Sequence, residues 1–84
     1  MVNYYIYIVE CKDGSLYTGY ARDVEARVEK HNQGLGAKYT RNRRPVKLKY
    51  QEVFDSKSDA MKREIQIKKL SRRDKLNLIE GGKS

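Results

Sequence analysis

The stretch NYYIYIVECKDGSLYTGY, residues 3–20, decides the fold. It holds two runs of β-branched and aromatic residues, and Lys12, Asp13 and Gly14 stand between them. Such runs joined by a short Asp-Gly segment predict a β-hairpin. The hairpin has two alternative connections. One is a two-residue turn at Asp13-Gly14, and the other is a three-residue loop that adds Lys12 and holds Gly14 in the left-handed conformation.

The choice of connection decides which tyrosines share a face of the sheet. The two-residue turn pairs Tyr7 with Tyr20 and puts Tyr17 on the opposite face from Tyr7. The three-residue loop pairs Tyr7 with Gly19, so that Tyr7 and Tyr17 share one face. We favour the three-residue loop because it collects purely aliphatic side chains on the other face: Ile6, Ile8 and Leu16.

A helix is predicted directly after the hairpin. Asp23 can cap a helix that runs from about residue 24 to residue 33, and Gly34 can end it. The segment GLGAKYTRNRRP, residues 34–45, is predicted to be a basic loop, because Pro45 excludes a helix that continues through it.

The second half of the chain adds one strand and two helices. The alternating segment VKLKYQEVF, residues 46–54, predicts a third strand, and Ser56 and Ser71 each open a helix with an Asp three residues later. The order ββαβαα predicts an α+β fold, a small three-stranded antiparallel sheet flanked by helices. We expect residues 1–80 to form a single domain and residues 81–84 to be a loose C-terminal tail.

Charge is the strongest signal in the composition. The 84 residues include 19 Lys and Arg against 11 Asp and Glu, a net charge of +8, which favours binding to polyanions such as nucleic acid. The single cysteine, Cys11, excludes an internal disulfide and a Cys-based zinc site and fits a reducing compartment. No apolar run reaches the length of a membrane-spanning helix, so we expect a cytoplasmic protein without a membrane partner.

Glu64 is predicted to point toward the apolar face of its helix. It lies within about 30° of the mean direction of the apolar residues around it, which are Ala60, Met61, Ile65, Ile67 and Leu70. An inward carboxylate needs a cation, because burial of an unpaired charge is costly. The cation is either a basic side chain, for which Lys68 is well placed, or a metal ion, and this pattern leaves both open.

Arg27 and His31 are four residues apart and therefore share one face of the predicted first helix. His31 is the only histidine in the chain. By itself such a pair is an ordinary feature of a helix surface, and two tyrosines on one face of a sheet are usually part of a core. Whether these side chains form a functional site depends on whether they lie close to Glu64 in the fold.

Taken together and in order, these residues resemble the GIY-YIG nuclease family. The resemblance begins at Tyr5-Ile6-Tyr7 and Tyr17-Thr18-Gly19, and it continues through RDVEAR (22–27), HNQG (31–34) and REIQIK (63–68). Either tripeptide alone is a weak signal, whereas the ordered series is a specific one. The resemblance covers essentially the whole chain and is closest to the small stand-alone, single-domain bacterial-type members.

The resemblance implies a GIY-YIG fold and a one-metal hydrolysis of phosphodiester bonds in nucleic acid. Tyr7 and Tyr17 would be the paired catalytic tyrosines, and Arg27 and His31 would be catalytic residues of the first helix. Glu64 would be catalytic as the sole protein ligand of one divalent cation, Mg²⁺ or Mn²⁺. No small-molecule cofactor is expected beside this ion.

The chemistry of these side chains agrees with such roles. Arg27 offers a fixed fork of donors to the negative charge that cleavage puts on phosphate oxygens. Mg²⁺ tolerates one protein carboxylate when water and phosphate oxygens complete its octahedron. Two groups compete as the base that deprotonates the attacking water. The resemblance favours a tyrosine such as Tyr17, with His31 assisting, but His31 is a rival base because its ordinary pKa is near 6.5.

The chain departs from the family pattern at three positions. Tyr5 replaces the first glycine, and Thr18 replaces the isoleucine of the second tripeptide. Tyr39 stands where some family members carry a second histidine. These departures concern how closely substrate approaches the strand and how the attacking water is activated.

Binding of nucleic acid is assigned mainly to the basic loop. Its candidate contacts, together with one residue of the following helix, are Lys38, Tyr39, Arg41, Arg43, Arg44 and Lys68. Tyr39 is the candidate for stacking on a base. Further basic residues extend this surface: Lys62, Arg63, Lys69, Arg72 and Arg73. If about six phosphates are contacted, log affinity should fall with log salt at a slope of about −5.

The sequence therefore predicts a metal-dependent endonuclease that acts on DNA, with structured or branched DNA as a candidate substrate and RNA as the alternative polymer. The competing hypothesis is a DNA- or RNA-binding module that keeps the fold and the basic surface without cleaving.

Overall fold

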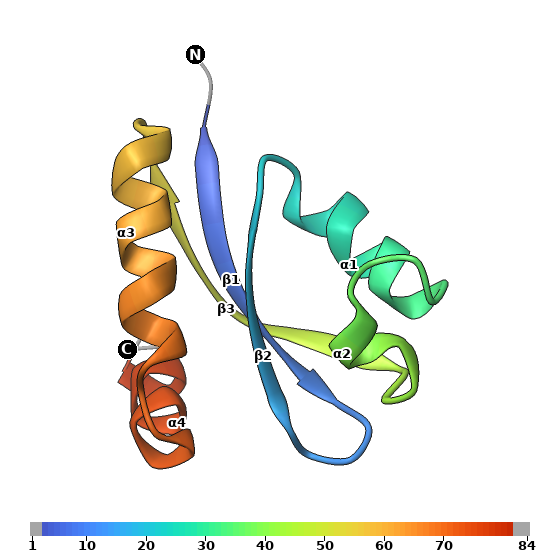
Figure 1. Ribbon diagram of the computed structural model, residues 1–84. Coiled ribbons are helices and arrows are strands. Elements are labelled where there is room, and N and C mark those ends of the chain that lie inside the picture. The colour runs from blue at the N-terminus through green and yellow to red at the C-terminus, as the bar shows by residue number, and fades with distance from the viewer. Residues whose placement is uncertain (1–2, 82–84) are drawn as a thin grey trace.

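Residues 3–81 are described by the computed structural model, and they form a three-stranded antiparallel sheet with helices on both faces (Figure 1). The strands lie in the order β2-β1-β3, with β1 Tyr4–Cys11, β2 Leu16–Ala21 and β3 Val46–Phe54. The helices are α1 Val24–Asn32, α2 Lys38–Arg41, α3 Lys57–Lys68 and α4 Arg72–Gly81. Among these residues, no helix is both long and apolar enough to span a membrane.

The α+β architecture is confirmed, and the element order differs from prediction by one element. The observed order is ββααβαα, because the segment predicted as a basic loop contains the one-turn helix α2. This helix begins after Ala37, which offers no side-chain cap, so its start carries none of the usual sequence signals. It ends four residues before Pro45, in agreement with the limit that the proline sets.

The hairpin adopts the predicted three-residue loop. Tyr7 pairs with Gly19 and Val9 pairs with Tyr17, and Gly14 has a φ of 85°, in the left-handed region. Tyr7 and Tyr17 consequently share one face of the sheet. Alternate residues of the same two strands point to the other face, where Ile6, Ile8 and Leu16 lie.

Each face of the sheet carries its own core. On one face, α1 contributes Val24 to a cluster with Tyr7, Val9, Cys11, Ala21 and Val46. On the other face, α3 and α4 cover Ile6 and Ile8 with the apolar residues Ala60, Ile67 and Ile79. Figure 1 shows the same division, with α1 and α2 on one side of the strands and α3 and α4 on the other.

The helix caps follow the sequence, whereas one core assignment is wrong. Asp23 accepts a hydrogen bond from the Ala26 amide at 3.1 Å, and Ser56 accepts one from the Asp59 amide at 3.4 Å. Ile65, which was counted with the apolar face of α3, is 54% exposed. It lies at the edge of the apolar arc, and the contact between α3 and the sheet is narrower than that arc.

The last helix reaches the edge of the described chain. α4 ends at Gly81, and the remainder of the predicted tail, residues 82–84, lies outside the described residues.

Candidate active site

A chain of hydrogen bonds runs from β1 through α1 to α2. The Tyr7 hydroxyl lies 2.7 Å from Nε2 of His31, and Nδ1 of His31 lies 2.8 Å from Oγ1 of Thr40. Thr40 in turn donates to the carbonyl oxygen of Ala37 at 3.1 Å. Tyr7 and His31 are each 1% exposed, and Thr40 is fully buried. The three side chains are therefore shielded from bulk water.

The direction of this chain follows from Thr40. Because the Thr40 hydroxyl donates its proton to Ala37, its oxygen accepts the proton on Nδ1 of His31, and Nε2 must then accept from Tyr7. Burial and the nearby Arg27 lower the pKa of His31, which keeps the ring neutral. Burial raises the pKa of Tyr7 far above the usual value, so the phenol keeps its proton.

Two glycines leave space for the hydrogen-bonded side chains of Tyr7 and His31. A Cβ atom on Gly19, the residue opposite Tyr7, would lie 2.5 Å from the Tyr7 hydroxyl oxygen. A Cβ atom on Gly36 would overlap the His31 ring at Nδ1. The glycine of the second tripeptide is thus required by the ring of the first, and Gly36 holds the loop close against the histidine.

Tyr17 lies between solvent and the hydrogen-bonded series of Tyr7, His31 and Thr40. Its ring meets His31 edge-on, with the centroids 5.4 Å apart, and it is only half-buried. It also stacks on Tyr39, with the centroids 5.8 Å apart and an angle of 25° between the rings. The guanidinium of Arg43 lies 4.1 Å from the centroid of Tyr39. These aromatic contacts connect the catalytic tyrosine predicted on β2 to the basic segment.

The charges of Arg27 and Glu64 both affect the pKa of Tyr7, although their helices lie on opposite faces of the sheet. After burial, the neighbouring Tyr17 raises the pKa of Tyr7, Arg27 lowers it, and the carboxylate of Glu64 raises it. Each of the two charged side chains is therefore close enough to Tyr7 to act on its proton. Of the five residues predicted as catalytic, His31 contacts both Tyr7 and Tyr17, and Arg27 and Glu64 lie within electrostatic reach of Tyr7.

Glu64 is turned inward and has one basic neighbour. Its side chain is 12% exposed, and its Oε2 lies 3.4 Å from Nζ of Lys68, whose side chain is 51% exposed. The candidate basic partner of Glu64 is thus present, but it occupies the solvent side of the carboxylate. Pairs of this kind at i and i+4 contribute little when one member is exposed.

The donor set suits a weakly held hard cation. Among residues 3–81, no group of three His, Cys, Asp or Glu side chains is arranged to hold a metal ion. A single inward carboxylate fits Mg²⁺ or Mn²⁺, which keep several waters and borrow substrate oxygens, and it does not fit an ion enclosed by protein ligands. Glu64 is the residue that would hold such an ion, and Lys68 would have to leave it.

The basic segment divides into side chains bound within the fold and side chains that face solvent. Arg43 forms a salt bridge with Asp13 at 3.1 Å and donates to the Tyr39 carbonyl at 2.7 Å. Arg44 donates from Nε to the Arg41 carbonyl at 2.8 Å and from Nη1 to the Asn32 carbonyl at 3.4 Å. These contacts fix the segment against the end of α1 and the turn of the hairpin.

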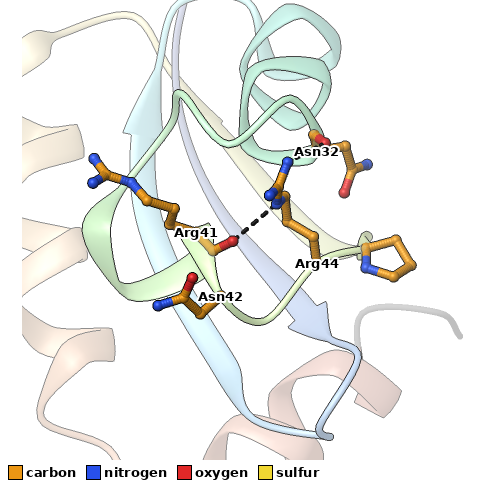
Figure 2. A pocket seen from close by; sticks show the side chains of 5 residues that line it. Asn32, Arg41, Asn42 and Arg44 are labelled. Carbon is orange, nitrogen blue, oxygen red and sulfur yellow. Dashed lines mark hydrogen bonds between the residues drawn. The ribbon is translucent and has the colours of Figure 1, made fainter.

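Figure 2 shows the pocket beside this segment, with Arg44 directed toward Asn32 and the guanidinium of Arg41 extending away from that of Arg44. Arg41 and Lys38 are exposed, as a binding surface requires. A second correction concerns Arg63, which was counted with the basic surface. It donates from Nε and Nη2 to Glu52 at 3.0 Å each, and so joins α3 to β3.

Sequence reasoning missed Thr40 and Gly36. The hydroxyl of Thr40 holds the tautomer of His31, and the missing side chain of Gly36 makes room for its ring. The signal in the sequence that could have pointed to Thr40 is its place as a β-branched hydroxyl residue within the charged segment 38–44. Recognising its role requires knowing that α2 packs against α1.

Comparison with known proteins agrees with this geometry. The chain matches the GIY-YIG catalytic domain over residues 3–77. It is 66% identical to a UPF0213 protein of Staphylococcus saprophyticus over 82 residues, which are 98% of this chain and 100% of that protein. It is 62% identical to a UPF0213 protein of Staphylococcus aureus over 80 residues, which are 95% of this chain and 98% of that protein.

Two solved structures are similar. The solution structure of a UPF0213 protein from Bacillus halodurans superposes with a TM-score of 0.61 at 54% identity, covering 93% of this chain and 83% of that one. A solution structure of a protein from E. faecalis superposes with a TM-score of 0.66 at 42% identity, covering 96% and 86%. The match over residues 3–77 confirms the resemblance at the paired tripeptides, and the chain belongs to the family of GIY-YIG catalytic domains.

Proposed function

We propose that this protein is a metal-dependent endonuclease that hydrolyses phosphodiester bonds in DNA, with structured or branched DNA as its substrate. The observation that supports the proposal is the convergence on one phenol. Arg27 of α1 and Glu64 of α3 both act on the proton of Tyr7, although their helices cover opposite faces of the sheet. Charged side chains that perturb the pKa of a buried tyrosine are frequent in active sites.

Arg27 binds the scissile phosphate. Its guanidinium is half-buried beside two neutral groups, Tyr7 and His31, so its positive charge is not cancelled by either of them. A donor fixed in this way stabilises the charge that builds up on the non-bridging oxygens as water attacks.

Glu64 holds one divalent cation, Mg²⁺ or Mn²⁺. When bound, the cation supplies positive charge that offsets the charge developing on the leaving oxygen. Lys68, which pairs with Glu64 through an exposed side chain, turns to a phosphate of the substrate.

Tyr17 meets the attacking water. Tyr7 and His31 are each 1% exposed, whereas Tyr17 is half-buried and reaches solvent. The hydrogen bonds that link Tyr7, His31 and Thr40 then have two tasks. They hold the His31 ring against Tyr17, and they leave Nε2 of His31 as the acceptor for the Tyr7 hydroxyl. Cys11 is a buried free thiol, and we place the reaction in the reducing cytoplasm.

The test is a nicking assay with Mg²⁺ on a supercoiled plasmid and on a branched oligonucleotide. Glu64→Ala and Arg27→Ala should each lower the cleavage rate by about 10²–10³-fold. Glu29→Ala is the matched control, because Glu29 is an exposed glutamate of α1 and its loss should leave the rate unchanged. Cleavage that survives in both active-site variants would rule out this site.

A second function is favoured by one observation, the ion pair between Glu64 and Lys68. If that pair persists in solution, the protein is a DNA- or RNA-binding module whose affinity comes from its net charge of +8. Binding would then depend on salt and be indifferent to Mg²⁺ and to Glu64→Ala.

A further inference from the structure

A pocket of about 210 Å³ lies beside the candidate active site, between the hairpin, α2 and α4. Its lining combines an aromatic ring with two cations and consists of Ser15, Leu16, Tyr39, Arg72 and Lys75. None of the residues of α4 belongs to the five catalytic candidates. The pocket therefore needs an explanation of its own.

Lys75 is the unusual member of the lining. Its side chain is half-buried, and burial together with the neighbouring Lys68 lowers its pKa. Among residues 3–81, none of the salt bridges includes Lys75 or Arg72. The acid next to the pocket, Asp13, is already bonded to Arg43 and Ser15. An anion placed in the pocket would relieve the repulsion between the two lysines.

The other members are held in position for the same anion. Arg72 donates from Nη1 to the Gly14 carbonyl, which fixes its guanidinium at the hairpin turn. Tyr39 is 41% exposed although it is stacked on Tyr17 and lies beside Arg43. Because Tyr17 stacks on this ring and the Arg43 guanidinium lies over it, Tyr39 offers the pocket its exposed edge.

Two series of side chains connect the lining of the pocket to the active-site residues. One is a series of rings, with steps of 5.8 Å from Tyr39 to Tyr17 and 5.4 Å from Tyr17 to His31. The other is a series of charges from Lys75 through Lys68 to Glu64. A strand whose scissile phosphate lies at Arg27 would therefore place a neighbouring nucleotide at the pocket.

We propose that this pocket binds one nucleotide of an unpaired DNA strand next to the scissile bond, with Lys75 and Arg72 on its phosphate and the exposed edge of Tyr39 against its base. The proposal rests on the proposed function for the identity of the polymer. An unpaired strand is required because a base within a duplex is paired and stacked on both sides, so it cannot turn into the pocket. The pocket thus selects junctions and flaps over intact duplex.

Binding without cleavage tests the pocket. Fluorescence anisotropy in EDTA would compare a duplex carrying a single-stranded flap with a blunt duplex of the same length. Lys75→Met keeps the aliphatic stem and removes the charge. It should weaken flap binding by about tenfold and reduce the salt slope by about 0.7, the value for one phosphate contact on a single strand. Lys75→Arg should restore both, and Tyr39→Leu, which removes the aromatic edge, should weaken flap binding by a further factor of about three.

Lys57→Met is the matched control, because Lys57 is an exposed lysine at the start of α3 and should change flap binding less than twofold. Equal losses in Lys75→Met and Lys57→Met, or equal losses on flap and blunt duplex, would overturn the pocket. Thermal melts of each variant exclude unfolding as the cause.

The two proposals fail in different ways. If Lys75→Met weakens flap binding selectively but the wild-type protein never cleaves with Mg²⁺, the pocket stands and the endonuclease does not. If the protein cleaves and Lys75→Met binds flaps normally, only the pocket fails. If the wild-type protein binds no DNA, both fail.

Discussion

On one face of the hairpin, Ile6 and Ile8 pack against Ala60 and Ile67 in an apolar cluster, and Thr18, the partner of Ile8 on β2, is buried on the same face. On the other face, Tyr7 stands between those two isoleucines in sequence and donates its proton to a buried histidine. Both cores are equally hidden from water, since Ile6, Ile8 and Tyr7 are each at most 1% exposed. The two cores differ because burial on one face serves stability, whereas burial on the other also holds Tyr7 and His31 in defined protonation states.

The comparison shows how a chain of 84 residues supports both tasks. A domain this small has a thin margin of stability, and each buried polar group adds a desolvation penalty unless it is fully bonded. The polar face meets this requirement by satisfying every hydrogen-bonding atom of His31. The aliphatic face buries one hydroxyl, that of Thr18, which has no hydrogen-bond partner within residues 3–81, and its apolar side chains supply stability without precise partners.

The largest expected effect separates the two faces by function. Tyr17→Phe removes one hydroxyl at the solvent boundary and should lower the cleavage rate by about 10²–10⁴-fold, because that hydroxyl meets the attacking water. Tyr20→Phe is the matched control, since Tyr20 is half-buried on the same strand but packs on the aliphatic face. Single-turnover cleavage at saturating protein would measure both, and a normal rate in Tyr17→Phe would remove Tyr17 from the mechanism.

The next effect separates the faces by stability. Ile67→Ala empties a fully buried site of the aliphatic core and should lower the free energy of unfolding by about 2–5 kcal/mol. Ile65→Ala, on the same helix but at a position 54% exposed, should change it by no more than about 0.5 kcal/mol. Urea unfolding followed by circular dichroism measures both. Similar losses would contradict the narrow contact between α3 and the sheet.

A smaller effect isolates the hydrogen bond from Thr40. Thr40→Val keeps the shape but leaves the Nδ1 proton of His31 without an acceptor, so we expect a loss of about 1–3 kcal/mol in unfolding free energy. Thr40→Ser keeps the hydroxyl and should lose about 1 kcal/mol, for the missing methyl group. The ¹⁵N shifts of the His31 ring report the tautomer directly. A ring protonated at Nε2 in the wild-type protein would reverse the assigned direction of the chain.

The smallest effect is the dependence of stability on pH. Folding lowers the pKa of His31 below its ordinary value near 6.5, through burial first and Arg27 second. Below that ordinary value the unfolded chain takes up a proton that the folded chain refuses, so stability is complete above about pH 6.5 and falls as the pH drops below it.

Asp13 and Glu52 titrate below this window. Hydrogen bonds from Ser15 and Arg63 hold the pKa values of Asp13 and Glu52 below the ordinary carboxyl range. Urea unfolding at pH 7, 6 and 5 should therefore show a decline in the wild-type protein that is flatter in His31→Gln. An identical slope in both proteins would show that His31 is not the group responsible.

Much of the fold could be predicted because its signals are local. The position of Gly14 sets the hairpin register, and the capping side chains of Asp23 and Ser56 precede their helices directly. The inward direction of Glu64 could also be predicted, since it depends only on the rotation per residue of one helix.

The parts that sequence reasoning missed depend on contacts between distant elements. Thr40 acquires its role because α2 packs on α1, and α2 itself begins without a capping side chain. Arg63 leaves the basic surface because β3 presents Glu52 to it. Ile65 is exposed because the width of the contact between α3 and the sheet is set by the sheet and not by the helix.

Gly19 has a consequence for how this chain can change. The phenol ring at position 7 fills the volume that a side chain at position 19 would need, so Tyr7 and Gly19 are sterically complementary. A larger residue at 19 can be accepted only when the ring at 7 shrinks in the same step. A library that randomises position 19 alone should therefore return glycine, whereas larger residues at 19 become accessible when position 7 is varied with it.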